Sequence, residues 1–161
     1  VDCSGSYGNM GCNGGLMDNA FKYVEKYGLT TEAAYPYTAR DGKCQSFTAV
    51  SGSKIASYQD AQQSVAGVMA LLQNGPVSIA IEADQTSFQY YSGGILQSGC
   101  GTSLDHGVLI VGAGTENNVD YWIVKNSWGS SWGENGYIRI KRSDSNGGVC
   151  GVNLSASQPQ Y

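Results

Sequence analysis

The chain has 161 residues, of which 41% are hydrophobic, so it fits one domain or two small ones with a buried core. Its formal net charge is −4 and it has no basic cluster, so we do not expect a nucleic acid as a partner. No run approaches the roughly 18 apolar residues of a membrane span, and we expect no membrane partner either. The chain opens on Val-Asp-Cys-Ser without an initiator methionine or a signal peptide, which predicts a processed or truncated piece.

Residues 1–15 are rich in Gly, Ser and Asn and predict a loop. A helix is expected from about Leu16 to Tyr27, with Gly28 as its stop. A turn-rich stretch and a short strand at Lys54–Tyr58 should follow. A second helix is expected within residues 57–76, with Asp60 as N-cap. Its buried stripe would consist of Val65, Val68, Met69 and Leu72.

After Pro76 the hydrophobic period becomes alternating, because Val77, Ile79 and Ile81 are separated by Ser78 and Ala80. Further strands are predicted at Phe88–Tyr91, His106–Val111, Tyr121–Lys125 and Gly136–Arg142. Glycine-rich turns between them are typical of a small antiparallel barrel. Early helices and late strands indicate an α+β protein with a helical lobe followed by a β lobe.

The five cysteines form no Cys-x-x-Cys pair, and the chain has one histidine, so we expect no metal site and no cofactor. Their wide spacing in a glycine-rich chain predicts disulfides and an oxidising compartment. The odd count leaves one cysteine without an internal partner. It is either a free thiol or bonded to a segment outside this sequence.

The only histidine, His106, begins a predicted strand after a polar turn, where its ring can face a cleft. A histidine base needs a partner on its second ring nitrogen to fix its tautomer, and the carbonyl of Asn126, at the end of the neighbouring strand, can provide it. Trp128 can cover that bond. Each residue also has an ordinary interpretation: a locally bonded histidine, a turn asparagine, a core or surface tryptophan.

Five motifs follow one another in the order found in papain-family cysteine proteases, and the chain resembles that family, in particular its cathepsin L-like group. The motifs are Gly11–Gly15 (GCNGG), Asp105–Gly107 (DHG), Lys125–Gly129 (KNSWG), Trp132–Tyr137 (WGENGY) and Val149–Gly151 (VCG). The resemblance covers residues 1 to about 157. It implies a two-lobe fold with an α-helical left lobe and an antiparallel β-barrel right lobe. Residues 1–56 would be the remainder of an incomplete left lobe, residues 57–154 the right lobe, and residues 155–161 a segment returning toward the left lobe.

By this resemblance His106 is the catalytic base and Asn126 its orienter, while Trp128 shields their bond and Trp132 walls the leaving-group side. The family's nucleophilic cysteine and oxyanion-hole glutamine precede the first residue of this sequence. The family pattern implies the disulfides Cys3–Cys44 and Cys100–Cys150, with Cys12 bonded to that segment or to a companion chain.

The resemblance also implies a substrate-binding surface. Gly14 and Gly15 match glycines that bond to an extended substrate, and the carbonyl of Asp105 faces the scissile residue. The pocket for the second residue before the cut is walled by Leu16, Met17, Ala80, Gly107 and Ser155. None is acidic, so we expect Leu, Phe or Val to be preferred there over Arg.

The function that this resemblance implies is that of a cysteine endopeptidase, lysosomal, vacuolar or secreted, with peptide or protein substrates, protein inhibitors and a propeptide as partners. Without its nucleophile the chain alone is expected to be inactive. Two alternatives stay open: a catalytically inactive protease-like binding protein or inactive fragment, and a disulfide-stapled binding module unrelated to proteases.

Overall fold

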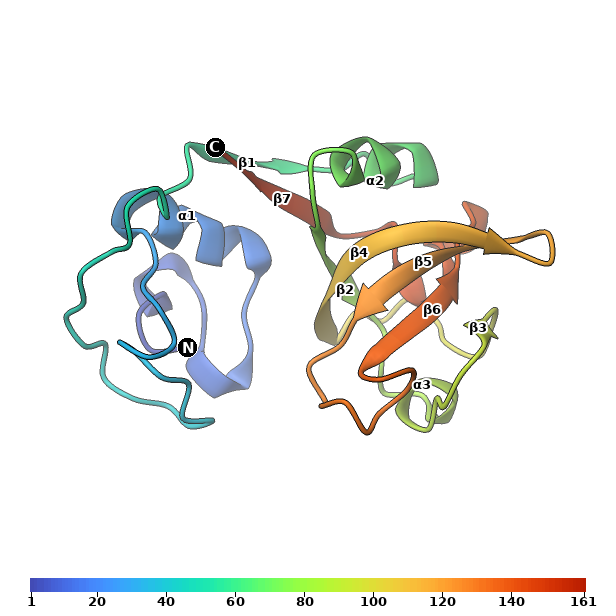
Figure 1. Ribbon diagram of the computed structural model, residues 1–161, viewed down its shortest axis with the longest axis horizontal. Coiled ribbons are helices and arrows are strands. Elements are labelled where there is room, and N and C mark those ends of the chain that lie inside the picture. The colour runs from blue at the N-terminus through green and yellow to red at the C-terminus, as the bar shows by residue number, and fades with distance from the viewer. The chain divides into compact units, whose positions relative to one another are not determined.

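A computed structural model describes residues 1–161, the whole chain. The chain divides into two compact units, one of residues 1–59 with 159–161 and the other of residues 60–158. The first contains a single α-helix, and the second contains two helices and most of the sheet (Figure 1). None of the helices has the length and apolar character needed to cross a lipid bilayer.

The helices are α1 (Met17–Tyr27), α2 (Val65–Leu72) and α3 (Thr86–Gln89). Short 3₁₀ turns occur at Gly5–Tyr7, Gly11–Asn13, Ser145–Gly147 and Val149–Gly151. The strands are β1 (Ser57–Asp60), β2 (Val77–Ile81), β3 (Ile95–Leu96), β4 (His106–Glu116), β5 (Val119–Lys125), β6 (Tyr137–Lys141) and β7 (Ala156–Gln160). They form one seven-stranded sheet in the order β1-β7-β2-β4-β5-β6-β3. Strand β2 pairs antiparallel with β4 and β7, β5 with β4 and β6, and β3 joins β6 in parallel.

The first unit is organised around α1 and the disulfide Cys3–Cys44. Helix α1 agrees with the predicted helix to within one residue. It ends because Gly28 adopts a φ of 68°, a left-handed value that glycine accepts readily, and donates its N–H to the Val24 carbonyl at 2.9 Å.

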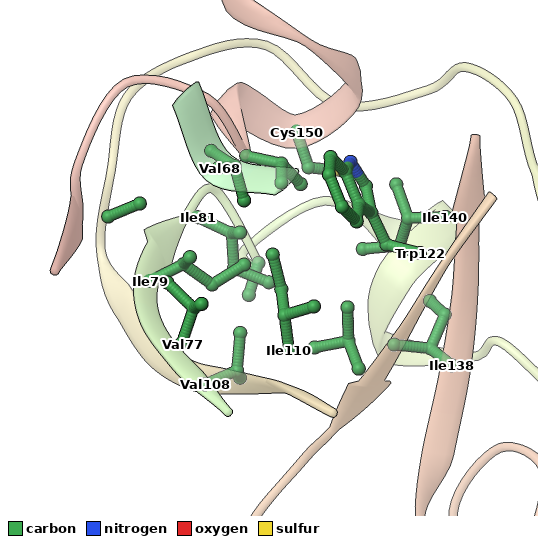
Figure 2. Close-up of a cluster of buried hydrophobic side chains, with 14 of the residues drawn as sticks. Val68, Val77, Ile79, Ile81, Val108, Ile110, Trp122, Ile138, Ile140 and Cys150 are labelled. Atoms are coloured by element: carbon green, nitrogen blue, oxygen red, sulfur yellow. The ribbon is translucent and has the colours of Figure 1, made fainter. Parts of the chain in front are cut away.

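The core of the second unit lies against the strictly alternating strand β2, as the sequence predicts. Val77, Ile79 and Ile81 are all 0% exposed. Figure 2 shows these side chains pointing into the same cluster as residues of β4, β5 and β6, with Trp122 the largest of them. The β4–β5 hairpin is the longest pairing of the sheet (Figure 1), and its register shifts between Ile110 and Gly112.

The predicted strand at Phe88–Tyr91 is wrong, because the chain there forms the single helical turn α3. Phe88 and Tyr91 are three residues apart and both buried, and the Tyr91 N–H donates to the Phe88 carbonyl at 3.1 Å. A spacing of three places both rings on one side of a helical turn, whereas a strand would turn them to opposite faces.

The predicted cap of the second helix is also wrong. Ser64, not Asp60, caps α2, and its Oγ accepts a hydrogen bond from the Gly67 N–H at 3.0 Å. The buried stripe of this helix includes Leu71 in addition to Val68, while Val65, Met69 and Leu72 are only partly buried.

Five strands differ from the sequence expectation by more than one residue. Strand β4 continues to Glu116, beyond the predicted Val111, and β5 begins at Val119 rather than Tyr121. Strand β1 begins three residues later than the predicted Lys54–Tyr58, and β3 and β7 were not predicted. Strand β7 has the sequence Ala-Ser-Gln-Pro-Gln, without the β-branched or aromatic residues that favour strands. Its place depends on tertiary contacts, because Gln158 donates from Nε2 to the carbonyls of Gly75 at 2.8 Å and Pro76 at 3.0 Å.

An ion pair joins Arg139 of β6 to Glu134, and its contribution to stability can be tested. Arg139 donates to both carboxylate oxygens of Glu134 at 2.9 Å, and the Gly94 N–H donates to one of them at 2.9 Å. The Arg139 guanidinium therefore holds the pKa of Glu134 below its ordinary value.

A carboxylate whose pKa is lowered on folding stabilises the fold at pH values above its unfolded pKa of about 4.3, and that contribution is lost as the pH falls through the folded value. We expect the melting temperature of the wild type to fall more steeply below about pH 4.3 than that of Glu134→Gln. Thermal unfolding of both proteins at a series of pH values on either side of about 4.3 measures this difference in slope. Parallel curves for the two proteins would show that the pair contributes nothing pH-dependent.

Candidate active site

His106 is the first residue of β4 and is held by the neighbouring strand. It pairs across the sheet with Ile81 of β2, and the N–H of the preceding Asp105 donates to the Ile81 carbonyl at 2.9 Å. The backbone at His106 is therefore fixed by the ladder, while its half-buried ring lies at the end of the sheet. This placement suits a group that must reach substrate from a rigid element.

The ring of His106 is bonded to Asn126, the residue that follows β5. The two residues are 20 positions apart, and His106 Nε2 lies 2.7 Å from Asn126 Oδ1. Asn126 is 8% exposed, and its backbone N–H donates to the Gly136 carbonyl at 3.1 Å. The backbone of Asn126 is therefore fixed independently of its side-chain bond to His106.

A neighbouring amide determines the direction of this bond. The backbone N–H of Ser127 donates to the same Asn126 Oδ1 at 2.8 Å. A flipped Asn126 would turn its NH₂ group toward that N–H, so the oxygen must occupy this position and accept from both. His106 therefore carries its proton on Nε2, and in the neutral ring Nδ1 keeps the lone pair that can accept a proton.

A cluster of aromatic rings adjoins His106. The Trp128 ring lies 5.0 Å from that of His106 at an interplanar angle of 31°, and Trp128 itself is 41% exposed. Phe88, which is 0% exposed, lies 5.5 Å from Trp128 and 5.1 Å from Trp132. The Trp132 Nε1–H donates to the carbonyl of Gln89 at 3.0 Å.

The predicted site does not include Phe88 and Gln89. Both lie in α3, where part of a strand is expected from the sequence instead of a helical turn. The spacing of Phe88 and Tyr91 is the sequence signal that would have identified the helical turn. The cluster leaves His106 under an apolar cover, where an electrostatic interaction is stronger than in water.

Three of the predicted pocket residues lie together in the second unit. Ala80 pairs with Gly107 between β2 and β4, and its N–H donates to the Ser155 carbonyl at 3.0 Å. None of the three carries a charge. Asp105 is exposed, and its Oδ1 accepts a hydrogen bond from the Ala83 N–H at 2.8 Å, so its side chain anchors the loop.

The other four predicted substrate-binding residues belong to the first unit. Gly14, Gly15 and Leu16 are exposed, and Met17 is half-buried at the start of α1. A Cβ at Gly15 would lie 2.3 Å from the Asn9 Oδ1, which accepts the Leu16 N–H at 2.8 Å. A side chain at position 15 would therefore collide with Asn9 and disturb its bond to the Leu16 N–H, which favours glycine there.

Each of the two units contains one disulfide, and one cysteine is free. The first contains Cys3–Cys44 and the second Cys100–Cys150, which are the pairs that the resemblance implies, and Cys12 is an exposed free thiol. Partial desolvation and the nearby Asp41 carboxylate raise the pKa of Cys12, the opposite of what a thiolate nucleophile needs. No group of His, Cys, Asp or Glu side chains is arranged to hold a metal ion.

Comparison with known proteins identifies the family. The model of the papain family cysteine proteases matches residues 1–160. The chain belongs to the papain family. Among its relatives, it is 51% identical over 163 residues to the probable cysteine protease RD21B of Arabidopsis thaliana and 49% identical over 165 residues to a cathepsin L-like protein of Caenorhabditis elegans. Each alignment covers 99% of this chain, but 35% and 48% of the respective relative.

Solved structures of papain-family proteins have the same fold. Digestive procathepsin L 3 of Tenebrio molitor superposes with a TM-score of 0.90 and 46% identity, covering 99% of this chain and 53% of that one. Bromelain of Ananas comosus, in complex with the E64 inhibitor, superposes with a TM-score of 0.88 and 36% identity, and the match covers 95% of this chain and 73% of bromelain. The α+β papain-like fold is thereby shown. The chain spans less than half the length of the curated relatives it matches, from 35% to 49%.

Proposed function

We propose that this chain supplies the base half of a cysteine endopeptidase site. The observation that carries the proposal is the His106–Asn126 bond, because it places the proton on Nε2 and leaves Nδ1 as the acceptor. The papain-family match supports the reaction class. The nucleophilic thiol would come from a segment outside residues 1–161, since four of the five cysteines are bridged and Cys12 has a raised pKa.

The mechanism follows from the position of that proton acceptor. His106 Nδ1 takes the proton of the thiol, and the thiolate attacks the carbonyl carbon of the scissile peptide bond. The C–N bond breaks as His106 returns the proton to the leaving amine. A water molecule then gives a proton to His106 and attacks the thioester, which releases the acid and restores the thiol. Asn126 holds the ring through both transfers, and Trp128 covers the bond.

The test compares two proteins, the 161-residue chain and the full-length protein, on a fluorogenic peptide. We expect hydrolysis by the full-length protein and none by the chain alone, since the base without a nucleophile cannot form the thioester. A full-length protein that folds, contains the upstream cysteine and binds but does not cleave peptides would favour the protease-like binding protein instead.

The partners follow from the same proposal. Substrates would be peptides or proteins, and the solved relatives include an E64 complex and a proenzyme, which supports inhibitors and a propeptide as further partners. Cys12, free and exposed, would bond to the nucleophile-bearing segment or to a companion chain. An oxidising, lysosomal, vacuolar or extracellular environment is consistent with the two disulfides.

The uncharged Ala80, Gly107 and Ser155 predict the substrate preference. We expect Leu, Phe or Val before Arg at the second residue before the cut, as read from a peptide library. Ser155→Glu should shift the ratio toward Arg by at least about tenfold, since a hydrogen bond between charged groups contributes roughly 1.5–3 kcal/mol and about 1.4 kcal/mol corresponds to tenfold. Ser155→Gln is the matched control and should leave the ratio near that of the wild type. Arg preferred by the wild type would contradict the pocket assignment.

A further inference from the structure

Glu82 is a buried carboxylate at the end of β2, next to the loop that leads into His106. It is 5% exposed, although the alternation of β2 would turn it away from the core. Its Oε2 accepts the Ser103 N–H at 2.8 Å, and Gly101 lies against the same carboxylate, since a Cβ built there would be 2.6 Å from Oε2. Its Oε1 accepts from Gln85 Nε2 at 2.8 Å.

No cation compensates this carboxylate. The other charged groups around it are carboxylates: Asp84, which shares Gln85 Nε2 at 2.9 Å, and Asp105, which binds the Ala83 N–H. In place of a cation, the Ser103 backbone amide stabilises the charged carboxylate, and it holds the pKa of Glu82 below its ordinary value. A buried anion without a basic partner costs free energy, which indicates a specific task for it.

The bonds around Glu82 connect it to the loop of residues 101–104 and to both ends of that loop. Within residues 101–104, the Ser103 N–H is bonded to Glu82, and Gly101 packs against the same carboxylate. One end of the loop is fixed by Cys100–Cys150, and the other by Asp105, bonded to Ile81 and Ala83 on either side of Glu82. Glu82 is also tied to the disulfide, because its own N–H donates to the Cys150 carbonyl at 2.9 Å.

We propose that Glu82 is a positioning residue for His106. Resting on the proposed function, the inference is that its carboxylate holds the backbone of residues 101–104 in place, so that Asp105 and His106 enter β4 with the ring at the right distance from the thiol and the substrate carbonyl. Gly101 belongs to the same device. A Cβ there would lie 2.6 Å from Glu82 Oε2, so a side chain at position 101 would displace the carboxylate.

The test uses Glu82→Leu, Glu82→Gln and Gly101→Ala in the full-length protein. Glu82→Leu removes every acceptor, and we expect kcat/KM to fall by about 10- to 100-fold, mainly in kcat, since a misplacement near 1 Å can have an effect of this size. The pH profile of kcat/KM should change too, because the imidazolium is no longer held at its distance from the thiolate. Glu82→Gln keeps an oxygen for the Ser103 amide and should stay within about threefold of the wild type.

The control is Val68→Ala on α2, a fully buried residue outside the loop. It should lower the melting temperature of the protein and leave the pH profile unchanged. If Glu82→Leu behaves like Val68→Ala, the proposal is overturned. If Glu82→Leu does not fold, Gly101→Ala decides: a wild-type profile overturns the proposal, and a reduced kcat with a shifted profile supports it. A wild type without peptidase activity would instead refute the proposed function, so the two failures are distinguishable.

Discussion

His106→Ala in the full-length protein is expected to lower kcat/KM for peptide hydrolysis by about 10²- to 10⁴-fold, the usual contribution of a general acid–base group. Under the proposed function, the imidazole of His106, the only one in the 161 residues, accepts the thiol proton and returns it to the leaving amine. Steady-state hydrolysis of a fluorogenic peptide measures the loss.

Asn126→Ala provides the graded comparison. It removes the acceptor at 2.7 Å from Nε2 but leaves the imidazole, so its loss should be smaller than that of His106→Ala. The double variant should be no worse than His106→Ala alone, because the asparagine acts only through the ring. Additive losses would show that Asn126 has a separate role. Full activity in His106→Ala would remove the histidine from the mechanism.

Trp122→Ala is expected to destabilise the fold by about 3–5 kcal/mol, the range for deleting a large buried aromatic side chain. Trp122 is 0% exposed on β5, beside Cys150 and Ile140 in the cluster of Figure 2, and the Arg142 guanidinium lies 5.5 Å from its ring. Urea unfolding of the full-length protein, followed by circular dichroism, measures the change.

Trp128→Ala is the matched control, because the same residue type lies 41% exposed above His106. Trp128→Ala should lower the free energy of unfolding less than Trp122→Ala does. Relative to that loss of stability, it should reduce the rate of peptide hydrolysis more. Equal destabilisation by the two substitutions would mean that the aromatic cover over His106 is part of the structural core.

The elements with the strongest local patterns were predictable. The alternation of Val77, Ile79 and Ile81 predicts β2 and the face it buries, and the helical spacing from Leu16 predicts α1. The His106–Asn126 geometry was also accessible, since each residue borders a strand whose pattern is visible.

Other features depend on contacts that a local pattern does not contain. Strand β7 has little strand propensity, and it forms because β2 offers a free edge and Gln158 finds two carbonyls. The burial of Glu82 was hidden for a similar reason. Its Oε2 accepts a bond from the Ser103 amide, 21 residues further along the chain, and an acidic residue after an alternating strand otherwise predicts a solvent-facing position.

The most direct test of the central claim is the pH dependence of thiol alkylation by iodoacetamide in the full-length protein, compared between the wild type and His106→Ala. If His106 holds the proton of the nucleophile through Nδ1, the wild-type thiol should react rapidly below about pH 7. His106→Ala should react only as the pH approaches about 8.5, the pKa of a free cysteine. Superimposable profiles would contradict the assignment of His106 as the base.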